Sequence, residues 1–140
     1  MDDAQYKSFR THLPIPDEET APYWQGAREG ILRVKRCQPC DRPFFYPRTY
    51  CPSCGSSETE WMDASGRGTI YSFTVIAHHD VAPFKDWLPY VVALVELDEG
   101  PRLVTNIVGC EPNEVKVGRR VEVVFERVDE SVTLPKFKPV

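Results

Sequence analysis

The stretch CQPCDRPFFYPRTYCPSCG, from Cys37 to Gly55, contains four of the five cysteines in a chain of 140 residues. They form two Cys-x-x-Cys pairs with ten residues between them. Two residues between cysteines let one tight turn point both sulfurs at a single ion, and Zn²⁺ prefers four such ligands in a tetrahedron. In a reducing compartment these pairs indicate metal ligands rather than disulfides. We therefore predict one zinc site per chain, with iron or an iron–sulfur centre as the alternatives. Its ligands are Cys37, Cys40, Cys51 and Cys54.

The two cysteine turns differ in the residue that follows each pair. Gly55 suits the positive φ that turns backbone N–H groups toward sulfur, whereas Asp41 stands at the same place in the first turn. Aspartate tolerates left-handed geometry better than most residues, so this difference is mild. The aromatic-rich run FFYPRTY at residues 44–50 predicts a hairpin between the pairs, with Pro47 at its bend. Because cysteines fill all four positions, no place is left for a catalytic water, and we expect a structural metal.

Length and charge restrict the possible functions. The chain is one ordinary domain or two very small ones, and its net charge of −4 argues against nucleic acid, whose phosphates require a clustered positive field. The longest apolar stretch, Tyr90–Val95, is far too short to cross a bilayer. The first residues contain no apolar run of the secretory type. We therefore expect a cytoplasmic protein that uses neither a membrane nor nucleic acid as a partner.

The pattern along the chain predicts three segments. Residues 1–36 are predicted to be helical, with a helix that follows Thr20 and a lead-in strand at 31–36. So short a helix is marginal in water, so Tyr23 and Trp24 need a surface to pack on. That surface is either their own domain, which we favour, or another protein.

The remaining two segments are predicted to be β-structure. Residues 37–63 form the zinc ribbon, and residues 64–140 read as strands with turn signals and no helix. Residues 69–76 alternate in one unbroken register, and residues 98–101 form a hairpin turn. Five strands of this kind predict a small closed or partly open barrel, of which the OB-fold is the five-stranded version. The fold class is therefore mainly β.

Two groups outside the cysteine pairs could carry chemistry. Cys110 stands beside Glu111, whose charge raises a thiol pKa, so an idle thiol is the favoured interpretation. The run His78-His79-Asp80 is either an acid–base unit or a polar loop. We favour the loop, because no positioned nucleophile accompanies it.

Aromatic residues in the third segment allow alternatives of their own. Trp87 and Tyr90 either line a groove or plug the end of the barrel. Tyr71 and Phe73 either belong to the core or form a platform on which bases stack. The core is favoured, because strand aromatics in a small barrel usually pack inside and the acidic balance opposes nucleic-acid binding.

The runs PYWQGAREG, RCQPCDRPFFYPRTYCPSCGS, SGRGTIYSFTVI and PYVVALVELDEGPRLVTNIVG closely resemble the zinc-ribbon/OB-fold proteins long catalogued as a domain of unknown function. The resemblance begins near residue 14. It implies an N-terminal helical piece, a rubredoxin-like ribbon and an OB barrel. Such proteins are associated with acyl-CoA metabolism, as obligatory small subunits or fused domains beside thiolase-like enzymes, hydratases and related enzymes. The resemblance transfers the four ligand cysteines one by one and implies no catalytic residues.

Two hypotheses follow. The first is a non-catalytic subunit of an acyl-CoA-processing complex. A thiolase-type enzyme is the favoured partner, although an acyltransferase, aldolase or hydratase also fits. It would support its partner by assembly and by CoA-ester binding. The second is an independent OB-fold module that binds nucleic acid, which the charge disfavours. For the first, Arg48 and Arg67 bracket the junction of ribbon and barrel, and guanidinium groups suit the phosphates of CoA. Alternatively, both arginines are simply solvated at the surface.

Overall fold

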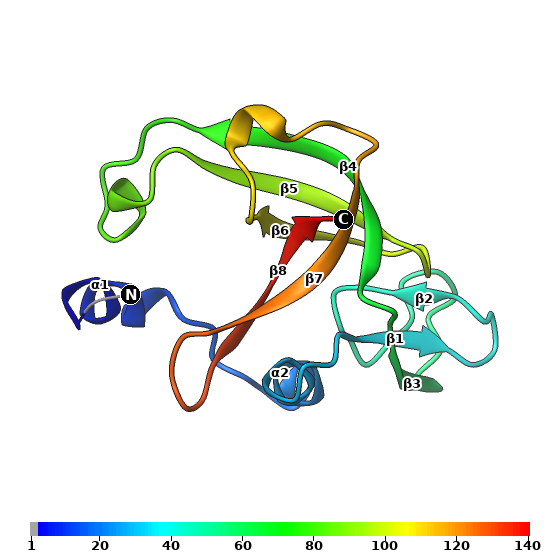
Figure 1. Cartoon of the computed structure of the whole chain (residues 1–140). Coiled ribbons are helices and arrows are strands. Elements are labelled where there is room, and N and C mark those ends of the chain that lie inside the picture. The colour runs from blue at the N-terminus through cyan, green and yellow to red at the C-terminus, as the bar shows by residue number, and fades with distance from the viewer. Residues whose placement is uncertain (1–2) are drawn as a thin grey trace.

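Two β-sheets organise residues 3–140, the part of the chain that the computed structural model describes (Figure 1). The ribbon sheet has the order β2-β1-β3, and the other five strands close a barrel in the order β4-β5-β6-β8-β7. The ribbon strands are β1 (Arg33–Cys37), β2 (Pro43–Phe44) and β3 (Thr59–Asp63). The barrel strands are β4 (Arg67–Ile76), β5 (Tyr90–Leu97), β6 (Arg102–Ile107), β7 (Arg120–Arg127) and β8 (Thr133–Pro139). The predicted mainly β fold with a five-stranded OB barrel is confirmed.

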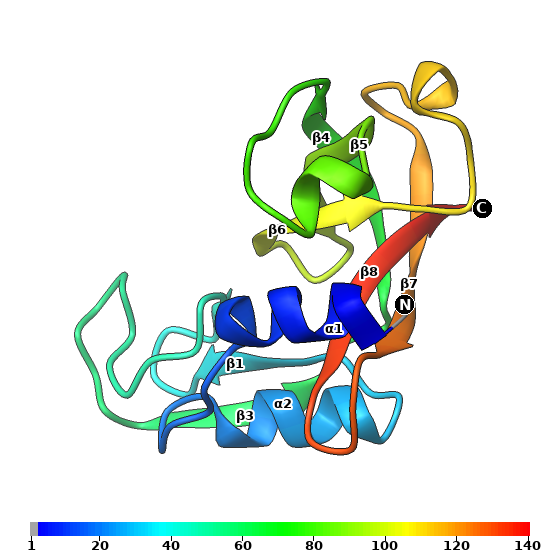
Figure 2. The same cartoon turned by 90° about the vertical axis from the view of Figure 1, so that its left-hand side faces the viewer.

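Helices are short and lie mainly at the start of the chain. They are α1 (Asp3–Phe9), η1 (Arg10–His12), α2 (Ala21–Arg28), η2 (Phe84–Asp86) and η3 (Pro112–Glu114). The helix predicted after Thr20 is α2, whereas α1 was not located from the sequence. Figure 2 shows α1 between the η2 segment and α2. None of the helices within residues 3–140 is long and apolar enough to cross a membrane.

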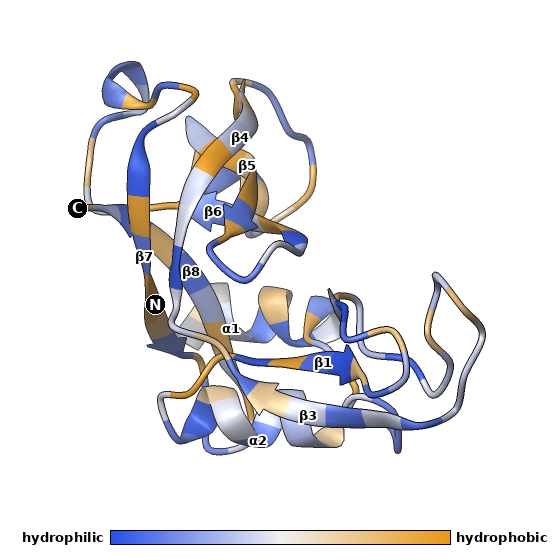
Figure 3. Ribbon diagram, turned by 90° about the vertical axis from the view of Figure 1, so that its right-hand side faces the viewer, coloured by the Kyte–Doolittle hydropathy of each residue, from blue (hydrophilic) through white to orange (hydrophobic). Residues whose placement is uncertain are grey.

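One hydrophobic core joins the ribbon side of the molecule to the barrel. Tyr23 of α2 and Val34 of β1 belong to the same buried cluster as Phe137 of β8. Trp24 is half-buried and packs against this cluster, so the own-domain interpretation of the α2 aromatics is confirmed. Hydrophobic and hydrophilic residues alternate along several of the strands, as Figure 3 shows. The buried members are Tyr23, Leu32, Val34, Ile70, Val91, Ala93, Val95, Leu97, Leu103, Ile107, Val115, Val121 and Phe137.

A bulge in β4 breaks the register that the sequence predicted. Ile70 pairs with Val95 and Ser72 pairs with Leu94, so Tyr71 is the extra residue. Phe73 packs against the core, but Tyr71 is 49% exposed and lies 3.7 Å beneath the guanidinium of Arg102. The single alternation over residues 69–76 and the core placement of Tyr71 are therefore wrong. A bulge turns every later side chain of the strand to the opposite face of the sheet. No residue type in this stretch of the sequence indicates a bulge.

Candidate functional site

The four predicted cysteines meet at one point. Their sulfur atoms all lie within 4.8 Å of one another, with Cys37 Sγ 3.5 Å from Cys54 Sγ and Cys40 Sγ 3.7 Å from Cys51 Sγ. Four thiolates, each about 2.3 Å from a central Zn²⁺, would be separated by about 3.8 Å in a regular tetrahedron. Both the donor set and the spacing thus fit a closed Cys₄ zinc site. Its ligands would supply rigidity and leave no open coordination position.

Two matching turns hold the sulfurs. Asp41 has φ 59° and Gly55 has φ 77°, so the left-handed geometry expected at both positions is confirmed. In the second turn the Ser53 N–H donates to the sulfur of Cys51 at 3.4 Å. Backbone N–H groups of Cys54 and Ser53 lower the pKa of the Cys51 thiol to about 6, because they stabilise the thiolate. At Cys51 the backbone therefore favours the charged sulfur that a zinc ligand requires.

The segment between the cysteine turns is not a hairpin. Within it β2 ends at Phe44 and pairs with β1, while residues 45–50 contain bends and no strand. The third ribbon strand, β3, follows the second cysteine turn and pairs along the full length of β1. Phe44 is buried against Cys37 and Cys51, so it fills the small core of the ribbon. The predicted hairpin at 44–50 is therefore wrong. The two edges of β1 are paired with β2, at the start of this segment, and with β3, after the second cysteine turn.

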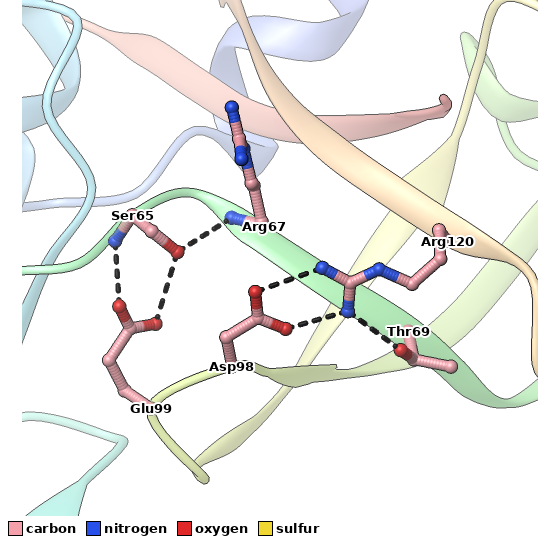
Figure 4. Close-up of polar contacts among 6 residues, drawn as sticks. All are labelled: Ser65, Arg67, Thr69, Asp98, Glu99 and Arg120. Atoms are coloured by element: carbon pink, nitrogen blue, oxygen red, sulfur yellow. Dashed lines mark hydrogen bonds and ion pairs between the residues drawn. The ribbon is translucent and has the colours of Figure 1, made fainter.

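Both arginines proposed for CoA phosphates are exposed. Arg67 opens β4, and Figure 4 shows its guanidinium pointing away from Asp98 and Arg120. Its backbone N–H donates to Ser65 Oγ at 3.2 Å. Arg48 directly follows Pro47, which lines a groove between β6 and β8. The role of the two arginines in CoA binding stays a prediction.

A groove that the sequence did not locate runs between β6 and β8, and we call it the β6–β8 groove. Its two lobes have volumes of about 270 and 480 Å³. Both lobes share the residues Val104, Thr105, Asn106, Leu134 and Lys136. The α2 lobe adds Thr20, Tyr23, Trp24, Phe45, Tyr46, Pro47 and Pro135. The α1 lobe adds Phe9, Phe84, Trp87, Tyr90, Val92, Ile107 and Val108.

Aromatic side chains form the walls of this groove. Phe9 of α1 is buried and meets Trp87 edge-on at a ring distance of 5.1 Å. Tyr23 and Phe45 lie 5.3 Å apart at the other lobe. Of the two interpretations of Trp87 and Tyr90, the groove is therefore confirmed. Volume and lining are typical of sites that bind apolar groups, with a few polar atoms to orient them.

The other candidates for chemistry are not assembled into a catalytic set. Burial, with the charges of Glu114 and Glu111, raises the pKa of Cys110, which disfavours its reactive thiolate. His78 is exposed and lies 3.1 Å from Asp80. His79 accepts a hydrogen bond from the Val81 N–H and packs against Phe84. These histidines lie in a polar loop, as favoured from the sequence.

Two family models cover this architecture. The model described as "ChsH2, rubredoxin-like zinc ribbon domain" matches residues 24–60, and "ChsH2, C-terminal OB-fold domain" matches residues 61–126. The chain belongs to this ChsH2 zinc-ribbon/OB-fold family. The expected family resemblance is thus confirmed, while the segment boundaries after residues 36 and 63 stay a prediction.

Several proteins of known description are similar to this chain. A DUF35 domain-containing scaffold protein of Methanocaldococcus jannaschii is 40% identical over 90% of this chain and 94% of its own length. A probable enoyl-CoA hydratase alpha subunit of Thermomonospora curvata is 39% identical over 90% of this chain, which spans only 39% of that subunit. The benzoylsuccinyl-CoA thiolase subunit BbsA of Thauera aromatica is 29% identical over 83% of this chain and 72% of its own. A solved Ltp2-ChsH2(DUF35) aldolase has a TM-score of 0.81 and 38% identity, over 91% of this chain and 98% of that chain.

Proposed function

We propose that this chain is a non-catalytic subunit of an acyl-CoA-processing complex, where it supports a thiolase-type enzyme by assembly and by CoA-ester binding. The observation that carries the proposal is the recurrence of one architecture in proteins named as subunits of a thiolase, a hydratase and an aldolase, and as a scaffold. The shared part cannot perform three different reactions with one catalytic set. What it can supply to all of them is a docking surface and contacts to the part of the substrate they have in common.

The geometry of the candidate sites favours a non-catalytic role. The Cys₄ centre is closed, burial raises the pKa of Cys110, and His78 is exposed. A covalent acyl-transfer site holds a nucleophile within hydrogen-bond reach of a base that a third group orients. Within residues 3–140 we find no such trio. The chemistry therefore belongs to the partner enzyme in this proposal.

The proposal assigns CoA-ester binding to the exposed arginines beside the ribbon. CoA carries several phosphate charges at one end and the reacting thioester at the other. An enzyme can hold the thioester and leave the nucleotide end poorly bound, so contacts from a small subunit add binding energy far from the chemistry. Remote contacts of this kind orient the reacting centre, so they affect kcat as well as KM.

Co-expression with the acyl-CoA enzyme of the source cell tests the proposal. Affinity capture from that cell identifies the enzyme, and the two chains are then produced together and measured by light scattering. We expect a stable hetero-oligomer that turns over its CoA ester and an isolated chain that turns over none. A rate that persists in the purified isolated chain and disappears in Cys110→Ala or His79→Ala would reveal a missed active site. Absence of a complex would remove the assembly role.

A further inference from the structure

Within residues 3–140, most of the β6 edge that faces β8 has no backbone pairing, although the two strands are neighbours in the closed barrel. Within the described chain β6 pairs with β8 at one position, Ile107 with Phe137, whereas it pairs with β5 along its whole length. The Leu97 N–H donates to the Pro101 carbonyl, so residues 103, 105 and 107 of β6 are the ones whose backbone groups bond to β5. Because bonding alternates along an antiparallel pair, the N–H and C=O of Val104 face away from β5, toward β8.

Pro135 explains why this edge stays open. The Phe137 carbonyl accepts from the Val108 N–H at 2.8 Å, so odd-numbered residues of β8 turn their backbone groups toward β6. The next rung of the ladder would need an N–H from Pro135 to the carbonyl of Val104, and proline has none. The Pro135 carbonyl accepts instead from the Thr105 hydroxyl, at 3.3 Å. The two strands therefore separate here, and the β6–β8 groove occupies the gap.

The chemistry of the groove restricts its occupant. Val104 is 54% exposed in the centre of the groove, between two aromatic lobes. The charged residue among the lining side chains, Lys136, is already paired with Glu126 at 2.8 Å. Charge complementarity therefore favours an uncharged occupant. That occupant must also offer a donor and an acceptor to one residue of a strand edge, which an extended backbone does.

We infer that a short, extended and uncharged segment of the partner enzyme adds to the Val104 edge of β6 as an extra strand. This inference rests on the proposed function, since it names the surface through which the subunit grips its enzyme. Successive side chains of a strand point to opposite faces, about 3.3 Å apart along the chain, so alternate apolar side chains can reach the lobes. The chain's own linker at residues 13–17 is unsuited to this place, because Pro14 and Pro16 lack N–H groups.

Amide hydrogen exchange on the co-expressed complex tests the inference residue by residue. The ¹⁵N-labelled chain exchanges alone, with CoA alone, and in the complex, and each amide is then followed by NMR. We expect the Val104 amide to slow about 100-fold or more in the complex alone, as for a newly formed strand hydrogen bond. Leu103 and Thr105, which bond to β5, serve as internal controls that are protected in every sample. Protection of Val104 by CoA alone would make the groove a small-molecule site and overturn the inference.

A pair of variants supplies the second measurement. Val104→Pro removes the outward N–H and leaves the bonds to β5 in place, whereas Val104→Thr keeps both the N–H and the shape. We expect Val104→Pro to weaken the complex about tenfold and Val104→Thr to change it little, since one lost hydrogen bond is worth about that factor. Thermal unfolding checks that both variants fold. A complex that forms with an unprotected Val104 amide overturns the inference and leaves the proposed function standing; failure to form any complex overturns both.

Discussion

Arg120 holds Asp98 at two points, with Nη1 2.6 Å from Oδ1 and Nη2 2.9 Å from Oδ2 (Figure 4). The same guanidinium donates to the Thr69 hydroxyl at 3.0 Å. The pair therefore joins the β5–β6 turn to β7 and to β4, at the end of the barrel where the ribbon enters. Hydrogen bonding to Arg120, with the charges of Arg120 and Arg67, lowers the pKa of Asp98 below its ordinary value.

We expect this ion pair to stabilise the fold at neutral pH and to fail in acid. A carboxylate whose pKa is depressed in the folded chain contributes stability above its unfolded pKa, near 3.8, and loses that contribution as the pH falls through the folded value. Asp98→Asn should therefore lower the unfolding temperature slightly at pH 7, and the difference from wild type should shrink progressively as the pH falls below 3.8. Thermal unfolding of both proteins across this range measures it. An equal difference at both ends would contradict the assignment.

Removal of the metal should unfold the ribbon. We expect one zinc ion per chain by elemental analysis, and its loss in Cys37→Ser. Structural zinc contributes about 10–16 kcal/mol in finger peptides, which is comparable to or larger than the whole stability of most domains. A chelator should therefore produce cooperative unfolding, followed by circular dichroism. Cys110→Ala is the matched control, because Cys110 lies outside the cluster, and it should keep the metal. Purified protein without zinc or iron would defeat the prediction.

Gly66 should not tolerate a side chain. It has φ +78°, and a Cβ there would lie 2.5 Å from Val123 Cγ1. Gly118 has φ +89° with open space around it, so a substitution there measures backbone strain without a steric clash. We expect Gly118→Ala to lower the free energy of unfolding by about 1–2 kcal/mol. Gly66→Ala should cost about 1–3 kcal/mol more, because of overpacking. Urea unfolding compares them, and equal losses would remove the steric argument.

Arg48→Ala and Arg67→Ala should weaken use of the CoA ester more than assembly. Each loses a charge-assisted bond to phosphate in our proposal, so we expect kcat/KM of the complex to fall about tenfold. Arg127→Ala is the control, since Arg127 is exposed at the far end of β7. Steady-state kinetics decide the matter. If both variants match the wild type in kcat/KM, the role in CoA binding fails and only the role in assembly remains.

Single-stranded nucleic acid should bind poorly. The net charge is −4, and the most exposed aromatic of β4, Tyr71, lies beneath Arg102, which also bonds to Glu96 at 2.8 Å. Nucleic-acid binding depends on released counterions and falls steeply with salt. We therefore expect negligible binding of a labelled oligonucleotide at about 150 mM salt, measured by fluorescence anisotropy. Micromolar, salt-sensitive binding would support the nucleic-acid module instead.

The features that could be predicted from the sequence were those that depend on residues close together in the chain. The spacing of Cys37, Cys40, Cys51 and Cys54 sufficed because a metal site depends on short turns with fixed ligands. The bulge at Tyr71 and the groove beside Val104 were not readable, since both depend on how strands pair far along the chain. Pro135 was the available signal for the groove. Its meaning emerges only when β8 is known to lie beside β6.

The core that Tyr23 and Val34 share with Phe137 has an evolutionary consequence. Because the ribbon contributes side chains to the interior of the barrel, replacing it with the ribbon of a relative would leave poorly matched packing between the two. Substitutions on α2, β1 and the inside of the barrel must therefore compensate one another, and recombination within this chain should succeed only where it transfers all three together.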